Sequence, residues 1–106
     1  MSFPPPGKRV LVVLFVPSVE RDGRTPVDQD RWVGAALGLF GRVFGGATAY
    51  PRARGVWRDD ERGGNLVFDE PVVLQAYMRP EAIEDPANLA RLATFCRSMG
   101  RETNQG

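Results

Sequence analysis

The feature that most constrains the fold is the run VLVVLFV, from Val10 to Val16, which is apolar at every position and is followed directly by Pro17. A strand with one face in solvent alternates apolar and polar residues, whereas a strand covered on both faces is apolar throughout. The pattern therefore predicts a central or covered strand over Arg9–Val16, which ends at the proline.

The same run raises the question of export, because Lys8 and Arg9 precede it as two cations precede the apolar part of a short signal peptide. No A-x-A-like cleavage site follows, and loss of the run would remove the most apolar segment of a small core. The single cysteine, Cys96, has no internal disulfide partner, which fits a reducing compartment. We therefore expect a cytoplasmic protein without a membrane-spanning segment.

Chain length and side-chain chemistry limit the possible functions. At 106 residues there is room for one domain, which we expect over residues 9–106, preceded by a flexible Pro-rich arm over residues 1–8. The chain contains no histidine, so Ser-His and Cys-His mechanisms are excluded. The net charge of +1 gives no global field for nucleic acid. No cofactor and no metal are indicated, and whether the protein is an enzyme stays open, with a non-enzymatic protein favoured.

A first helix is predicted from Thr25-Pro26 or Asp28 to Phe44, because these residues suit a helix cap and a first helical position. Gly45-Gly46 follows where the helix should stop. Its apolar stripe consists of Val33, Leu37, Phe40 and Phe44. A second stripe consists of Gly34, Gly38, Gly41 and Gly45. Because interior glycines cost about 0.5 to 1 kcal/mol each, we expect a close neighbour there, either a helix or sheet of this chain or a second copy.

The remaining elements follow in order. A second strand is predicted over Ala47–Tyr50, interrupted near Pro51–Gly55 by a bulge or bend, and resumed at Val56-Trp57. The run RDDERGG predicts a charged hairpin connection, after which Asn65–Met78 reads as the third strand. Asp85-Pro86 predicts the start of a second helix that carries Cys96 on its apolar side and stops at Gly100.

This order predicts an α/β sandwich with a ferredoxin-like βαββα topology, in which an antiparallel sheet carries two helices on one face. The final strand of that topology is absent here or supplied by a partner, which leaves the edge of the first strand free to pair. A homo-oligomer, or another protein completing the sheet, is therefore expected. The candidate interface residues are Val10, Val12, Leu14, Gly34, Gly38 and Gly41.

Dispersed motifs also resemble a known group of proteins. They are Trp32 near the start of the first helix, Phe44-Gly45 at its end, Thr48 shortly after, the pair Gly55 and Trp57, and a strand with an internal Glu70. Together they resemble a family of small uncharacterised bacterial ferredoxin-like domains over most of Val10 to Gly106. The resemblance supports the fold and implies no activity, and the chain departs from it by lacking the final strand.

Two groups of charged residues suggest binding chemistry. Asp59 and Asp60, with Glu61, offer oxygen ligands for Mg²⁺, although adjacent hairpin residues rarely converge and a solvated turn is favoured. A possible nucleic-acid surface comes from basic and aromatic side chains that alternate along one predicted strand face, although the acidic hairpin beside it argues against that use. The candidate binding residues are Tyr50, Arg52, Arg54, Trp57 and Arg58.

Glu70 falls on an otherwise apolar face of the predicted third strand, so its carboxylate must be paired or protonated, or Pro71 must turn it outward. Arg52 or Arg54 could pair with it. A structural ion pair or an outward turn is favoured over an acid and electrophile pair in a small cleft.

The function expected from these features is a non-enzymatic protein-binding or assembly module that acts through its sheet edge or face. The alternative is a small metal-dependent nuclease or toxin, or a nucleic-acid-binding protein of the same fold. The stretch RVLVVLFVPSVERDGR looks like the opening strand and loop of the CRISPR-associated integration subunit. That family's acid after the first strand is missing, since Val16-Pro17-Ser18 stands there.

Overall fold

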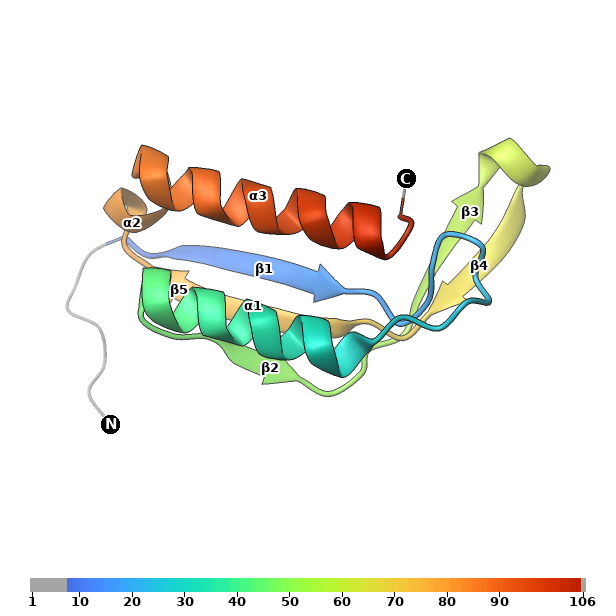
Figure 1. Ribbon diagram of the computed structural model, residues 1–106, viewed down its shortest axis with the longest axis horizontal. Helices are drawn as coiled ribbons and strands as arrows, with labels where there is room; N and C mark the ends of the chain where they lie inside the picture. Colours follow the sequence, from blue (N-terminus) through green and yellow to red (C-terminus); the bar gives the residue numbers. More distant parts are fainter. Residues whose placement is uncertain (1–7, 106) are drawn as a thin grey trace.

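The computed structural model describes residues 8–105, so the flexible Pro-rich N-terminal segment predicted for residues 1–8 falls, apart from Lys8, outside the described residues. The protein is a mixed α and β structure with two separate antiparallel sheets. Figure 1 shows a main sheet covered on one face by two helices, and a hairpin that projects beyond its end. The main sheet has the order β1-β5-β2 and consists of β1 (Val10–Val16), β5 (Val72–Met78) and β2 (Thr48–Tyr50).

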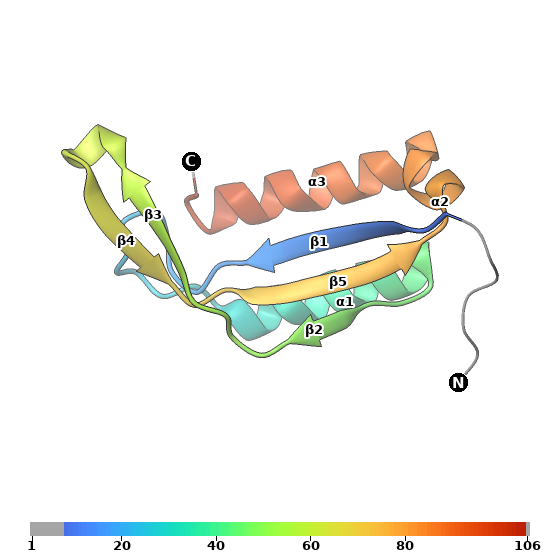
Figure 2. The same ribbon diagram turned by 180° about the vertical axis from the view of Figure 1, so that it is seen from behind.

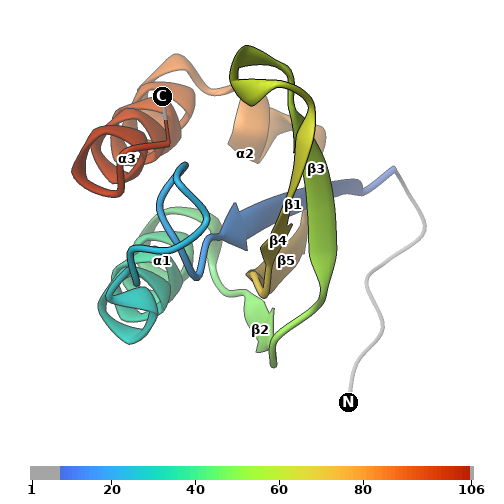
Figure 3. The same ribbon diagram turned by 90° about the vertical axis from the view of Figure 1, so that its right-hand side faces the viewer.

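The helices and the hairpin complete the element order. The helices are α1 (Gln29–Phe44), α2 (Pro80–Glu84) and α3 (Pro86–Glu102). The hairpin consists of β3 (Gly55–Asp59), the short 3-10 helix η1 (Asp60–Arg62) and β4 (Asn65–Asp69). Seen end-on in Figure 3, α1 and α3 lie on the same side of the main sheet, and no element of the described residues 8–105 covers its other face. No helix in the described part of the chain is long and apolar enough to cross a membrane.

Strand β1 pairs with β5 along its whole length, from Val10 opposite Met78 to Val16 opposite Val72, and in the described residues it has no partner at its other edge. It is therefore an edge strand. Its even-numbered side chains point toward the helices, and its odd-numbered ones are exposed. The expectation that both faces are covered is wrong, because both helices lie on one side.

The core lies between the main sheet and the two long helices. Its fully or nearly buried residues are Val16, Trp32, Ala36, Phe40, Leu74, Ala76, Met78 and Met99. Trp32 of α1 meets Phe95 of α3 edge-on, with ring centroids 5.8 Å apart. The buried line of α1 begins one residue earlier than the predicted stripe, since Val33 and Leu37 only flank the core.

The predicted helix boundaries are confirmed at three of their four ends. Asp28 caps α1 by accepting a hydrogen bond from the Arg31 N–H, and Gly45 ends it with φ +88°. Asp85 caps α3 by accepting from the Ala87 and Asn88 N–H groups. The predicted stop at Gly100 is wrong, because α3 continues until the buried Thr103, whose hydroxyl donates to the Met99 carbonyl at 2.6 Å.

The predicted second and third strands each divide between the two sheets. Residues 51–54 carry the chain from β2 in the main sheet to β3 in the hairpin, so the interruption is a change of sheet and no bulge. Pro71 separates β4 from β5 in the same way, because proline has no N–H for a sheet ladder. Its carbonyl accepts from the Ala53 N–H at 2.8 Å, which ties the two crossing points together. A charged connection is confirmed between β3 and β4, although Arg58 and Asp59 of the predicted run RDDERGG belong to β3.

The close neighbour predicted for the glycine stripe of α1 is absent from the described chain. A Cβ added at Gly34, Gly41 or Gly45 would meet nothing within 4 Å. At Gly38 it would meet only the Arg42 side chain of the same helix. The stripe is therefore an open helix surface here.

Candidate functional site

The face of the main sheet that the helices leave uncovered is unusually apolar, and we call it the open face. By strand alternation and register it consists of Leu11, Val13, Phe15, Thr48, Tyr50, Val73, Gln75 and Tyr77. None of these side chains is charged. Leu11 lies opposite Tyr77, and Val73 lies between Phe15 and Tyr50. Figure 2 shows this face of the sheet toward the viewer, with β5 between β1 and β2.

The exposure of the open face is large. Phe15 is 59% exposed, Tyr50 44% and Tyr77 65%. Because an aromatic side chain presents about 150–250 Å² when free, these three leave roughly 300 Å² in solvent. Leu11 and Val13 add to this area. Apolar patches of a few hundred Å² mark binding surfaces on soluble proteins. The open face is therefore a candidate binding surface.

A second apolar surface lies on the projecting hairpin, residues 55–69, which we call the arm. Three large apolar side chains stand on one side of it, Val56, Leu66 and Phe68, and they are 56%, 61% and 69% exposed. Val56 is paired directly with Phe68, and Leu66 with Arg58. We call these four side chains the arm face. In the single strand predicted over Asn65–Met78, alternation would place Leu66 and Phe68 on the same face as Leu74, but the division into β4 and β5 separates them.

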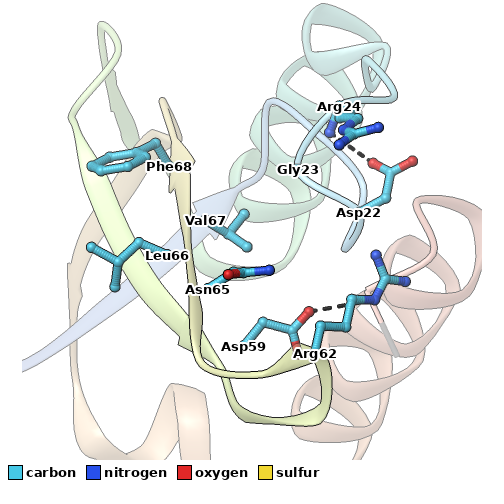
Figure 4. A pocket seen from close by; sticks show the side chains of 9 residues that line it. All are labelled: Asp22, Gly23, Arg24, Asp59, Arg62, Asn65, Leu66, Val67 and Phe68. Carbon is cyan, nitrogen blue, oxygen red and sulfur yellow. Dashed lines mark hydrogen bonds and ion pairs between the residues drawn. The ribbon is translucent and has the colours of Figure 1, made fainter.

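The other side of the arm rests against the loop after β1. Val67 lies so close to Gly23 that a Cβ added there would be 2.9 Å from the valine Cγ1. Arg21 of that loop pairs with Glu61 at 2.6 Å. In Figure 3 the loop lies on the helix side of the arm, and in Figure 4 Leu66 and Phe68 point away from the loop, so the arm face is turned away from the helices, as the open face is.

A pocket of about 500 Å³ lies between the loop and the arm. Figure 4 shows its nine lining residues, among which Asp59 faces Arg62 and Asp22 lies beside Arg24. Asp59 is buried and accepts from the Glu61 N–H at 3.2 Å, with Arg62 Nε at 3.5 Å. Both carboxylates are thus occupied by groups of the protein. Each carboxylate therefore stabilises its own segment, Asp22 the loop and Asp59 the tip of the arm.

The carboxylate of Asp22 has an unusual acidity. It accepts hydrogen bonds from the Thr25 hydroxyl at 2.5 Å and from the Thr25 and Arg24 N–H groups, both at 2.8 Å. These bonds, above all the one from the Thr25 hydroxyl, lower the pKa of Asp22 to about 2. The carboxylate stays ionised at any ordinary pH, and its hydrogen bonds stabilise the turn over residues 22–25.

A second hollow, of about 480 Å³, lies between the end of β1, the base of the arm and the end of α3. Phe15, Trp57 and Met99 line it, and so does Cys96. Burial raises the pKa of the Cys96 thiol, so this lining side chain carries no charge at neutral pH. Trp57, 38% exposed, belongs to this hollow and to no strand face shared with arginines.

The acidic candidates are not brought together. Asp59 faces Arg62, whereas Asp60 accepts a hydrogen bond from Arg58 Nε at the surface. In the described part of the chain no three His, Cys, Asp or Glu side chains could hold one metal ion. Glu70 lies at the bend before Pro71 with its side chain exposed, and no ion pair with Arg52 or Arg54 forms within residues 8–105. Of the alternatives predicted for Glu70, the structure shows the outward turn before Pro71.

The predicted basic and aromatic strand face does not form either. Tyr50 ends β2 on the open face, Arg52 and Arg54 lie in the crossing segment, and Arg58 lies on the arm. The candidate interface residues of β1 do not lie on the open face. Val12 and Leu14 pack against the core, and Val10 shares their side of the strand. The odd-numbered residues form the surface instead, and only the absence of polar residues from VLVVLFV signalled them.

Comparison with known proteins does not assign the chain to a group: no family model, no curated protein and no solved structure matches it.

Proposed function

We propose that this protein is a non-enzymatic protein-binding or assembly module that associates through the open face of its main sheet. The observation that carries the proposal is the exposure of Leu11, Val13, Phe15, Tyr50 and Tyr77 on a sheet face that holds no charged side chain. Covering such a face removes apolar area from water at about 25 cal/mol per Å², without a cost for desolvating charges.

The proposal includes a ferredoxin-like arrangement. The sheet order β1-β5-β2, with a long helix after β1 and another after β5, fits a βαββα unit in which the arm is inserted before the last strand of the sheet. In that topology a further strand lies beside β1, whose outer edge has no partner in the described chain. A partner strand at this edge is a second route of association. The free Cys96 agrees with a cytoplasmic setting.

Site-specific photo-crosslinking tests the proposal. A photoreactive amino acid replaces Val13 on the open face, and in a matched control it replaces the exposed Ala90 on α3. After irradiation in an extract of the native host, we expect adducts from position 13 and none from position 90, with the crosslinked peptides identified by mass spectrometry. Equal yields from the two positions would contradict the proposal.

A further inference from the structure

We propose that the partner is a second copy of this chain, and that the arm face of each copy packs against the other copy together with the open face. This inference rests on the proposed function and names its partner. The structure supports it through the size of the open face, the shape of the arm and the charges of both surfaces.

The open face alone is too small for a stable dimer. The seven residues each of β1 and β5 and the three of β2, at about 3.3 Å per residue and about 4.8 Å between strands, give a flat footprint of roughly 270 Å². A stable interface buries about 800 Å² on each partner. The deficit requires a second contact surface on the same side of the molecule, and the arm face provides one.

The elongated shape of the molecule indicates that the arm extends far enough to contact a second copy. The chain extends over 48 × 27 × 24 Å with a radius of gyration of 15.4 Å. A compact chain of this length would have a radius of gyration of about 13 Å. A two-stranded hairpin is marginally stable in water by itself. In the described chain, the Gly23 loop contacts one side of the arm, whereas Val56 and Phe68 on the other side stay 56% and 69% exposed.

The charges of the two surfaces favour a copy over an unrelated protein. A twofold dimer brings like surfaces together, so each must tolerate itself. The open face has no charge to repel its copy, and the single charge of the arm face, Arg58, already pairs with Asp60 in its own chain. Neutral, apolar surfaces of this kind are typical of obligate homodimers, whereas exchangeable partners are steered by complementary charges.

Sedimentation velocity over a micromolar to millimolar concentration series tests the inference. We expect the wild-type chain to dimerise, and Phe68→Ser on the arm and Phe15→Ser on the open face each to raise the dimer Kd by roughly tenfold or more. The matched control is Leu89→Ser, which removes a large side chain 49% exposed on α3, outside both surfaces, and should leave the Kd unchanged.

Circular dichroism establishes that each variant is folded. If Phe68→Ser unfolds, hydrogen exchange of the wild type replaces it: the β4 amides should exchange faster once dilution dissociates the dimer. A monomer at every concentration overturns the inference, and so does a dimer that Phe68→Ser does not weaken. If position 13 still crosslinks to another protein in the host extract, the open face keeps its proposed function and only the second copy is excluded.

Discussion

At the scale of single residues, hydrogen bonds and burial set the chemistry of two side chains in opposite ways. Asp22 is exposed to water but is held ionised by three donors from Thr25 and Arg24. Partial burial raises the pKa of the Cys96 thiol, which favours its neutral form. Neither side chain titrates near neutral pH.

For Asp22 we predict that Thr25→Val raises the pKa from about 2 toward its ordinary value, because the hydroxyl donor is lost. The folded pKa lies below the unfolded one, about 3.9. The stabilisation is therefore complete above the unfolded pKa and is lost as pH falls from there through about 2. Carboxyl ¹³C NMR titration measures the pKa. Arg24→Ala keeps its backbone N–H and serves as the control, and an unchanged pKa in Thr25→Val would refute the assignment.

For Cys96 we predict slow alkylation. Burial raises its pKa, so the reactive thiolate is scarcer in the folded chain than in the unfolded one at any pH below the folded value. The rate with iodoacetamide at mildly alkaline pH should be several-fold lower in buffer than in denaturant. Free cysteine measured in both solutions corrects for the solvent. Equal rates for the folded and unfolded chains would mean that the thiol is open to water.

At the scale of elements, both ends of α1 and the start of α3 were predictable because caps are local. Asp28 and Asp85 accept from N–H groups two or three residues further on, and Gly45 needs a left-handed backbone that glycine adopts without strain. The strands were not predictable to the same degree. Alternation shows which residues share a face only as long as the strand is continuous, and Pro71 ends that continuity.

The glycines of α1 give an element-scale prediction. Gly34 lies inside the helix with open space around it, so Gly34→Ala should raise the free energy of unfolding by about 0.5 to 1 kcal/mol. Gly45→Ala should lower it, because φ +88° is strained for any other residue. Urea unfolding measures both changes. Destabilisation by Gly34→Ala would indicate that another molecule packs on this helix.

At the scale of the whole molecule, the main body and the arm are joined through few contacts, and Gly23 lies at one of them. Gly23→Ala places a methyl group 2.9 Å from the Val67 side chain at φ +73°, so the arm should lose its support. We predict faster amide exchange in β4, by tenfold or more, with little change in β5. Gly45→Ala, equally strained but remote from the arm, should leave β4 exchange unchanged relative to β5.

The position of the candidate site also depends on the arrangement of the whole molecule. Sequence patterning pointed to the apolar strand VLVVLFV as the candidate interface, but it named Val10, Val12 and Leu14 as the interface residues. Those side chains turn inward because α1 and α3 lie on their side of the sheet. No local signal distinguishes the two faces of VLVVLFV, since both are apolar. The arm face was missed for a related reason, because it required the division of one apparent strand between two sheets.

What the sequence alone determined is local: the limits of α1, the start of α3, the turn between β3 and β4, and an antiparallel α and β class. Each depends on hydrogen bonds and backbone preferences within a few residues. Only the tertiary structure decided which face of β1 is buried, where the chain changes sheets and how far the arm projects. These features depend on segments that are distant in sequence, because burial is a property of what packs against a surface and not of the surface itself.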